Sequence, residues 1–119
     1  EALRLSVEKT KDQKGMTLQL ALNYGGRDEL VRAFETLKNS DIPVTETMIA
    51  QALDTAQMPD PDLIIRTGGD LRLSNFLLFQ AAYAELYFTD TLWPDFDEEA
   101  FDLAMEEFSR RQRRFGDVV

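Results

Sequence analysis

The chain has 119 residues and a formal net charge of −9, with 44% hydrophobic and 29% charged residues. This length fits one domain, the composition excludes global disorder, and the acidic balance argues against a nucleic-acid partner, which needs a basic face. The absence of cysteine excludes disulfides and thiolate metal sites, and the absence of histidine removes the commonest general base and zinc ligand.

The N-terminal part of the chain predicts two helices separated by a strand. Residues 2–9 are compatible with a helix, and residues 27–38 carry apolar side chains at helical spacing. Between them, Leu18, Leu20 and Leu22 alternate with other residues over positions 17–23. This period-two pattern is typical of a strand.

The rest of the chain predicts two further helices and two short strands. Thr45 can cap a short helix, which the proline-containing segment 58–62 ends. Residues 63–65 are apolar at every position, as expected of a buried parallel strand, and residues 85–88 predict another. Residues 97–115 predict the clearest helix, because acidic residues at its start and arginines near its end both complement the helix macrodipole.

Strands that alternate with helices favour an α/β fold, with a mostly parallel sheet flanked by helices. Only about three strands can be counted, which is few for such a sheet. The chain also begins at Glu1 rather than Met. We therefore expect one α/β unit over residues 1–119 that is a processed chain or part of a larger fold.

Two strand-to-loop junctions have the composition of an anion site. In open α/β sheets, ligands bind beyond the carboxyl ends of the strands. The segments 23–27 and 66–70 each combine two glycines, whose N–H groups can converge on an anion, with an arginine that suits phosphate. Arg72 and Ser74 would point to the same side of an extended segment. A tight turn is the alternative interpretation of each glycine pair.

Glu85 is a candidate metal ligand, because it lies among apolar and aromatic residues where an unpaired carboxylate is costly. Magnesium commonly takes one or two carboxylates together with phosphate oxygens of a substrate. The alternative is a structural ion pair with an arginine. Asp95 and Asp97, in contrast, are typical of turn and cap residues.

The C-terminal segment 110–116 is basic on an acidic chain. Considered by itself, it is best interpreted as a solvated helix end with a glycine cap at Gly116.

Three segments together resemble one family. The sequence "DLIIRTGGDLRLSNFLLFQAAYAELYFTDTLWPDF" resembles the signature of the cis-prenyltransferases, above all the bacterial undecaprenyl diphosphate synthases. The earlier "LNYGGRDEL" and the closing "RRQRRFG" match the same family in the same order. The departures are conservative: Asp70 stands where many members have Glu, and Phe79 where many have Trp.

The resemblance implies a Mg²⁺-dependent transferase that adds isopentenyl diphosphate units to farnesyl diphosphate with cis double bonds. The expected product is undecaprenyl diphosphate for cell wall biogenesis, made in the cytoplasm, with peripheral membrane contact for product release. The residues that the resemblance assigns to isopentenyl diphosphate are Arg66, Arg72, Leu73 and Ser74. It assigns Glu85 to Mg²⁺.

The resemblance also changes the interpretation of the C-terminal segment. Arg114 and Gly116 belong to the family's Arg-x-Gly motif, which reaches across a homodimer interface to the partner's substrate site.

One departure from the family pattern is large. The "DGNGR"-type phosphate loop, which carries the catalytic aspartate, and the "NWxRP"-type segment do not occur in this sequence. We therefore expect the C-terminal half of a cis-prenyltransferase, with no catalytic residue in this chain and no activity by itself. The alternatives are a non-catalytic subunit that binds isopentenyl diphosphate or dimerises, and an unrelated phosphate-binding α/β module.

Overall fold

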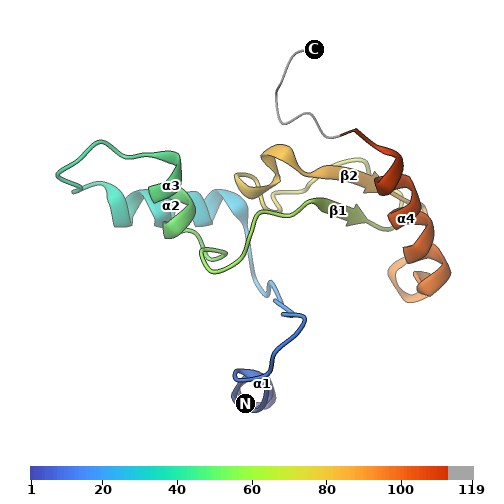
Figure 1. Ribbon diagram of the computed structural model, residues 1–119. Coiled ribbons are helices and arrows are strands. Elements are labelled where there is room, and N and C mark those ends of the chain that lie inside the picture. The colour runs from blue at the N-terminus through green and yellow to red at the C-terminus, as the bar shows by residue number, and fades with distance from the viewer. Residues whose placement is uncertain (113–119) are drawn as a thin grey trace.

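The computed structural model describes residues 1–112, in which two short parallel strands lie between helices (Figure 1). The α-helices are α1 (Ala2–Thr10), α2 (Gly26–Leu37), α3 (Glu46–Ala52) and α4 (Glu98–Arg110). The strands are β1 (Leu63–Arg66) and β2 (Glu85–Phe88), and the short 3-10 helices are η1 (Gln80–Tyr83) and η2 (Trp93–Asp95).

The two strands pair in parallel, with Leu63 opposite Glu85 and Arg66 opposite Phe88. Every side chain of both strands is half-buried. Parallel strands need a long connection, which is usually an α-helix. Here the connection over residues 67–84 is a loop that ends in η1, so a long loop leaves the carboxyl end of β1. The predicted α/β class and parallel pairing are confirmed.

The strand predicted over residues 17–23 is absent. These residues have no ladder in the described part of the chain, whose sheet contains β1 and β2 alone. Leu18, Leu20 and Leu22 are 73%, 57% and 67% exposed. The alternating pattern is present, but a strand forms only where a neighbouring strand accepts its hydrogen bonds, and the described residues provide none at this position.

The helix caps follow the sequence closely. The Thr45 hydroxyl accepts a hydrogen bond from Met48 N at 3.3 Å, and Asp97 Oδ1 accepts one from Ala100 N at 3.0 Å. The helix predicted to run to Phe115 instead ends at Arg110. Arg111 has an extended backbone, and its guanidinium turns back to donate to Leu86 O at 2.8 Å. Arg111 thus joins the end of α4 to β2.

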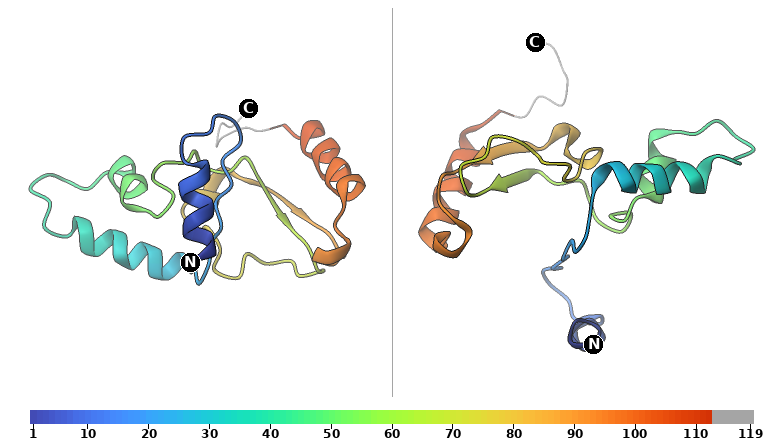
Figure 2. Two further views of the ribbon diagram at one scale, coloured as in Figure 1. Left: turned by 90° about the horizontal axis from the view of Figure 1, so that it is seen from below. Right: turned by 180° about the vertical axis from the view of Figure 1, so that it is seen from behind.

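Little of the chain is enclosed. The buried hydrophobic residues of the described part are Ala33, Leu53 and Ala104, and α1 buries none of its residues. Figures 1 and 2 show α1 apart from the sheet, joined to α2 by an extended segment. No helix within residues 1–112 is both long enough and apolar enough to cross a membrane.

Candidate functional site

A cluster of polar side chains forms where β1 ends. Arg66, the last residue of β1, donates from Nη1 to Ser74 Oγ at 2.8 Å and to the carbonyl oxygen of Arg72. Its Nη2 donates to Asp70 Oδ2 at 2.8 Å, and Arg72 Nη2 donates to Asp70 Oδ1 at 2.6 Å. We call Arg66, Asp70, Arg72 and Ser74 the arginine cluster. The structure thus brings together the three polar side chains that the sequence assigned to one anion.

The arginine cluster is open to an anion. The Arg72 side chain is 66% exposed, while that of Arg66 is 26% exposed and anchored by β1. Two guanidinium groups and one carboxylate give the cluster a formal charge of +1. Arginine forks bind phosphate oxygens in pairs, and the Ser74 hydroxyl lies beside the Arg66 fork. This donor set fits a diphosphate group.

Asp70 is a member of the cluster that sequence reasoning missed. Its carboxylate accepts from both arginines, so it holds two like charges side by side. The available signal was an acidic residue between two arginines in one loop. An incoming anion would compete with Asp70 for the two guanidinium groups.

The backbone of the glycine pair that follows β1 does not form an anion nest. Gly68 N donates to Thr91 O at 2.9 Å, and Gly69 N donates to Thr89 O at 3.0 Å. Both glycines have positive φ angles, 87° and 80°, so they make a tight turn. The predicted convergence of N–H groups is wrong here, because the loop after β2 already accepts them.

The glycine pair at the other junction is also occupied. Gly26 N donates to Asn75 O, and Arg27 N donates to Asn75 Oδ1. The predicted anion site over residues 23–27 is therefore wrong in this structure. The loop that carries Ser74 occupies the space where an anion would lie.

Glu85 forms the ion pair that was the alternative to a metal site. Arg111 Nη1 donates to Glu85 Oε2 at 3.0 Å, and both side chains are largely covered. The pKa of Arg111 is raised by its hydrogen bonds to Glu107 and Glu85. Within residues 1–112, no group of three or more acidic side chains that could hold a metal ion gathers around Glu85 or elsewhere. The described residues supply one carboxylate at this position, Glu85, and Arg111 holds it.

Of the other predicted site residues, Leu73 lies half-buried within the loop of the arginine cluster. Arg114 and Gly116 lie outside the described residues.

A buried polar network beside α2 was not predicted. Glu29 and Gln80 are 1% and 2% exposed, and the Tyr24 hydroxyl donates to Glu29 Oε2. Burial, together with the hydrogen bond to the Glu29 carboxylate, raises the pKa of Tyr24 to about 12. The Tyr24 ring also meets Phe76 edge-on, with centroids 5.8 Å apart. This network joins α2 to the loop after the arginine cluster.

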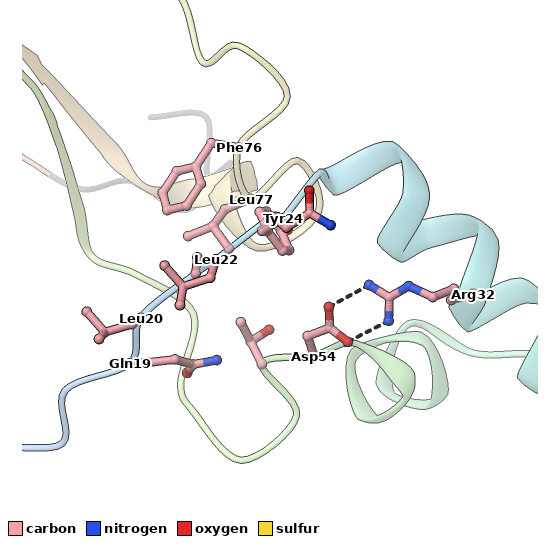
Figure 3. Close-up of a pocket in the computed structure, with 11 residues that line it drawn as sticks. Gln19, Leu20, Leu22, Tyr24, Arg32, Asp54, Phe76 and Leu77 are labelled. Atoms are coloured by element: carbon pink, nitrogen blue, oxygen red, sulfur yellow. Dashed lines mark hydrogen bonds and ion pairs between the residues drawn. The ribbon is translucent and has the colours of Figure 1, made fainter. Parts of the chain in front are cut away.

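A pocket of about 270 Å³ lies beside this network, and Figure 3 shows Leu20, Leu22 and Tyr24 along it. Arg32 and Asp54 form an ion pair at its edge, which lowers the pKa of Asp54. The pocket shares no lining residue with the arginine cluster. One wall of the pocket, residues 19–23, belongs to the segment whose predicted strand did not form.

Comparisons with known proteins agree on one family. The family model for undecaprenyl diphosphate synthase matches residues 1–116. An isoprenyl transferase of Streptococcus mutans is 54% identical over 99% of this chain, which covers 52% of that protein. An isoprenyl transferase of Wolinella succinogenes is 50% identical over 93% of this chain.

Two solved structures share the fold. A probable undecaprenyl diphosphate synthase of Campylobacter jejuni has a TM-score of 0.83 and 40% identity, with 97% of this chain and 54% of that chain covered. The lavandulyl diphosphate synthase of Lavandula x intermedia, solved with dimethylallyl diphosphate, has a TM-score of 0.91 and 35% identity. The match covers 98% of this chain and 53% of that one. The chain thus spans about half the length of the relatives it matches.

Proposed function

Since this chain belongs to the undecaprenyl diphosphate synthase family, we propose that it supplies the isopentenyl diphosphate site of a cis-prenyltransferase. In this proposal the complete enzyme condenses isopentenyl diphosphate units onto farnesyl diphosphate to make undecaprenyl diphosphate. The other half of the fold carries the catalytic aspartate.

The arginine cluster is the observation that carries the proposal. At the carboxyl end of a parallel strand, Arg66 donates to the Ser74 hydroxyl, and Asp70 joins the guanidinium groups of Arg66 and Arg72. A diphosphate presents oxygens at two phosphorus centres, so both guanidinium groups can bind it in pairs. Bound in this way, the substrate is fixed at one end, and its double bond can be aimed at an allylic carbon.

The diphosphate must replace Asp70 at one or both arginines. It carries more negative charge than a single carboxylate, and the exposed Arg72 can exchange partners at low cost. Asp70 then acts as a placeholder that keeps the two guanidinium groups in position between turnovers.

Magnesium stays a prediction from the family resemblance. Glu85 offers one carboxylate, which Arg111 holds in the described residues, so further ligands must come from elsewhere. Titration of the complete enzyme with Mg²⁺, with and without Glu85→Gln, tests this assignment. An equal metal requirement in both forms would contradict it.

The homodimer, the cytoplasmic location and the peripheral membrane contact also belong to the proposal. Sedimentation of the wild-type chain and of Arg114→Ala checks the role of the C-terminal segment in dimerisation. Cell fractionation checks the location, and an integral membrane fraction would contradict it.

The substrate site can be tested by substitution. Arg72→Ala removes one charged donor from the cluster and should weaken isopentenyl diphosphate binding by about 10- to 100-fold, as expected for hydrogen bonds to charged groups. Calorimetric titration measures the affinity. Arg110→Ala, which removes an exposed arginine of α4 paired with Glu106, is the matched control. An unchanged affinity in Arg72→Ala would reject the assignment.

The alternative function is a non-catalytic subunit that binds isopentenyl diphosphate. A turnover assay separates this alternative from the proposed enzyme half. The chain is mixed with both substrates and Mg²⁺, and turnover is measured before and after a polypeptide is added that carries the unmatched half of a relative. Turnover only after the addition supports the proposal. Retained binding without turnover in either mixture favours the non-catalytic subunit.

A further inference from the structure

The loop that carries Ser74 has an unusual backbone. Ser74, Asn75 and Leu77 have φ angles of 49°, 67° and 44°, in the left-handed region that residues other than glycine seldom enter. Asparagine tolerates this conformation better than most residues. Such conformations persist only where surrounding contacts hold them. The loop must therefore be held from outside.

The N-terminus of α2 holds it. Asn75 O accepts a hydrogen bond from Gly26 N at 2.7 Å, and Asn75 Oδ1 accepts one from Arg27 N at 2.9 Å. The first N–H groups of a helix have no partner within the helix, and an N-cap side chain usually accepts from them. In α2 the N-cap is Gly25, which has no side chain. Asn75 therefore caps α2 from a distant part of the chain, a contact that we call the Asn75 cap.

The glycine pair makes room for this contact. A Cβ on Gly25 would lie 2.9 Å from Asn75 Nδ2, and a Cβ on Gly26 would lie 2.8 Å from Leu78 Cγ. Both distances are too short for a real Cβ. The glycines at the start of α2 thus admit the loop.

A second contact holds the far end of the loop. Gln80 Nε2 donates to both carboxylate oxygens of Glu29, at 3.2 and 3.1 Å. Both side chains are buried, so water does not compete for these hydrogen bonds. The loop is fixed to α2 at Asn75 and again at Gln80.

We propose that Asn75 is a positioning residue for the diphosphate site, because its cap on α2 holds the adjacent Ser74 beside Arg66. Ser74 Oγ lies 2.8 Å from Arg66 Nη1, and Arg66 is fixed by strand pairing. Without the cap the left-handed turn relaxes, and the Ser74 hydroxyl leaves the arginine cluster. The identity of the ligand in this inference rests on the proposed function. The Asn75 cap is independent of that function.

The experiment uses the 119-residue chain with two separate readouts. Amide hydrogen exchange at Gly26 and Arg27 reports the cap directly. Calorimetric titration with isopentenyl diphosphate reports the site. Asn39→Ala, at an exposed asparagine in the turn after α2, is the matched control and should change neither readout.

The variants separate the two acceptors of Asn75. Asn75→Ala should speed exchange at both amides and weaken isopentenyl diphosphate binding by about tenfold, because alanine lacks the side-chain acceptor and disfavours positive φ. Asn75→Gly keeps the backbone conformation, so it should speed exchange at Arg27 alone and weaken binding less. Asn75→Asp keeps both acceptors and should leave exchange at both amides as in the wild type.

Two outcomes would overturn the proposal. Unchanged exchange in Asn75→Ala would show that the cap does not hold the loop. Faster exchange with unchanged affinity would show that the cap does not position Ser74. Suppose that exchange responds as expected but neither Arg72→Ala nor Asn75→Ala alters the affinity. The substrate assignment is then wrong, and so is the positioning role that depends on it. The Asn75 cap on α2 is still supported by the exchange data.

Discussion

At the scale of single residues, the geometry of Arg66 matters as much as its charge. One guanidinium contacts Ser74, Asp70 and the backbone of Arg72 at once. A lysine ammonium keeps the charge but has no planar fork. We expect Arg66→Lys to weaken isopentenyl diphosphate binding by about tenfold or more. Titration calorimetry checks this, with Arg4→Lys on α1 as the control, and equal affinities for the variant and the wild type would contradict it.

Tyr24 should stabilise the fold through the buried Glu29 carboxylate. Tyr24→Phe leaves that carboxylate without one donor, so we expect the free energy of unfolding to fall by about 1–3 kcal/mol at neutral pH. Urea unfolding measures the change. Tyr87→Phe, in β2, is the control and should have a smaller effect.

The hydrogen bond between Tyr24 and Glu29 also predicts that the free energy of unfolding changes at alkaline pH. The pKa of Tyr24 is raised from 10.0 to about 12 in the folded chain, so folding favours the neutral phenol. The contribution of Tyr24 to the free energy of unfolding is fully present below pH 10 and is lost as the pH rises through about 12. The difference in unfolding free energy between wild type and Tyr24→Phe should therefore shrink over this window. A difference that stays constant up to pH 12 would contradict the assignment.

At the scale of elements, the sequence predicted what depends on near neighbours. The caps at Thr45 and Asp97 lie three residues from the N–H groups that they accept from, so a local pattern contains both partners. The loop composition likewise grouped Arg66, Arg72 and Ser74, which lie in one cluster, and their binding role stays a prediction. The Asn75 cap joins residues 48 positions apart, and Arg111, just after α4, contacts Leu86 of β2, 25 positions away. No local pattern contains such partners.

The cap of α4 gives a direct test of this local reasoning. Asp97→Ala removes the acceptor for Ala100 N and should lower the free energy of unfolding by about 0.5–2 kcal/mol. Asp102→Ala removes the same charge from the same helix without removing the cap, and it should lower the free energy of unfolding by less. Thermal or urea unfolding of the two variants measures the difference. Equal losses would show that charge, rather than capping, stabilises the start of α4.

At the scale of the whole molecule, the chain is less enclosed than a folded domain of its length. Its accessible surface is 9964 Å², against roughly 6,600 Å² expected for a monomer of this mass. Its radius of gyration is 17.0 Å, against about 13–14 Å for a compact domain. The exposed leucines at positions 18, 20 and 22 are part of this excess surface. The chain matches about half the length of each of these relatives, so we expect the other half of the fold to cover this exposed surface.

Leu18, Leu20 and Leu22 should be the face on which the unmatched half of the fold docks. Alternate residues of an extended segment share one face, and Leu20 and Leu22 also line the pocket of Figure 3. We expect Leu20→Asp to abolish association with a polypeptide carrying the unmatched half of a relative. The stability of the chain by itself should change by less than about 0.5 kcal/mol, because this side chain is exposed.

Gln19→Asp is the matched control for this prediction, because it introduces the same charge at the neighbouring position, which alternates with the leucines in a period-two strand. Light scattering of the mixed polypeptides measures association, and urea unfolding of each chain measures stability. If docking adds a strand at residues 17–23, Gln19→Asp retains association while Leu20→Asp loses it. Equal association by both variants would place the contact elsewhere, and the exposed leucines would then need a different partner.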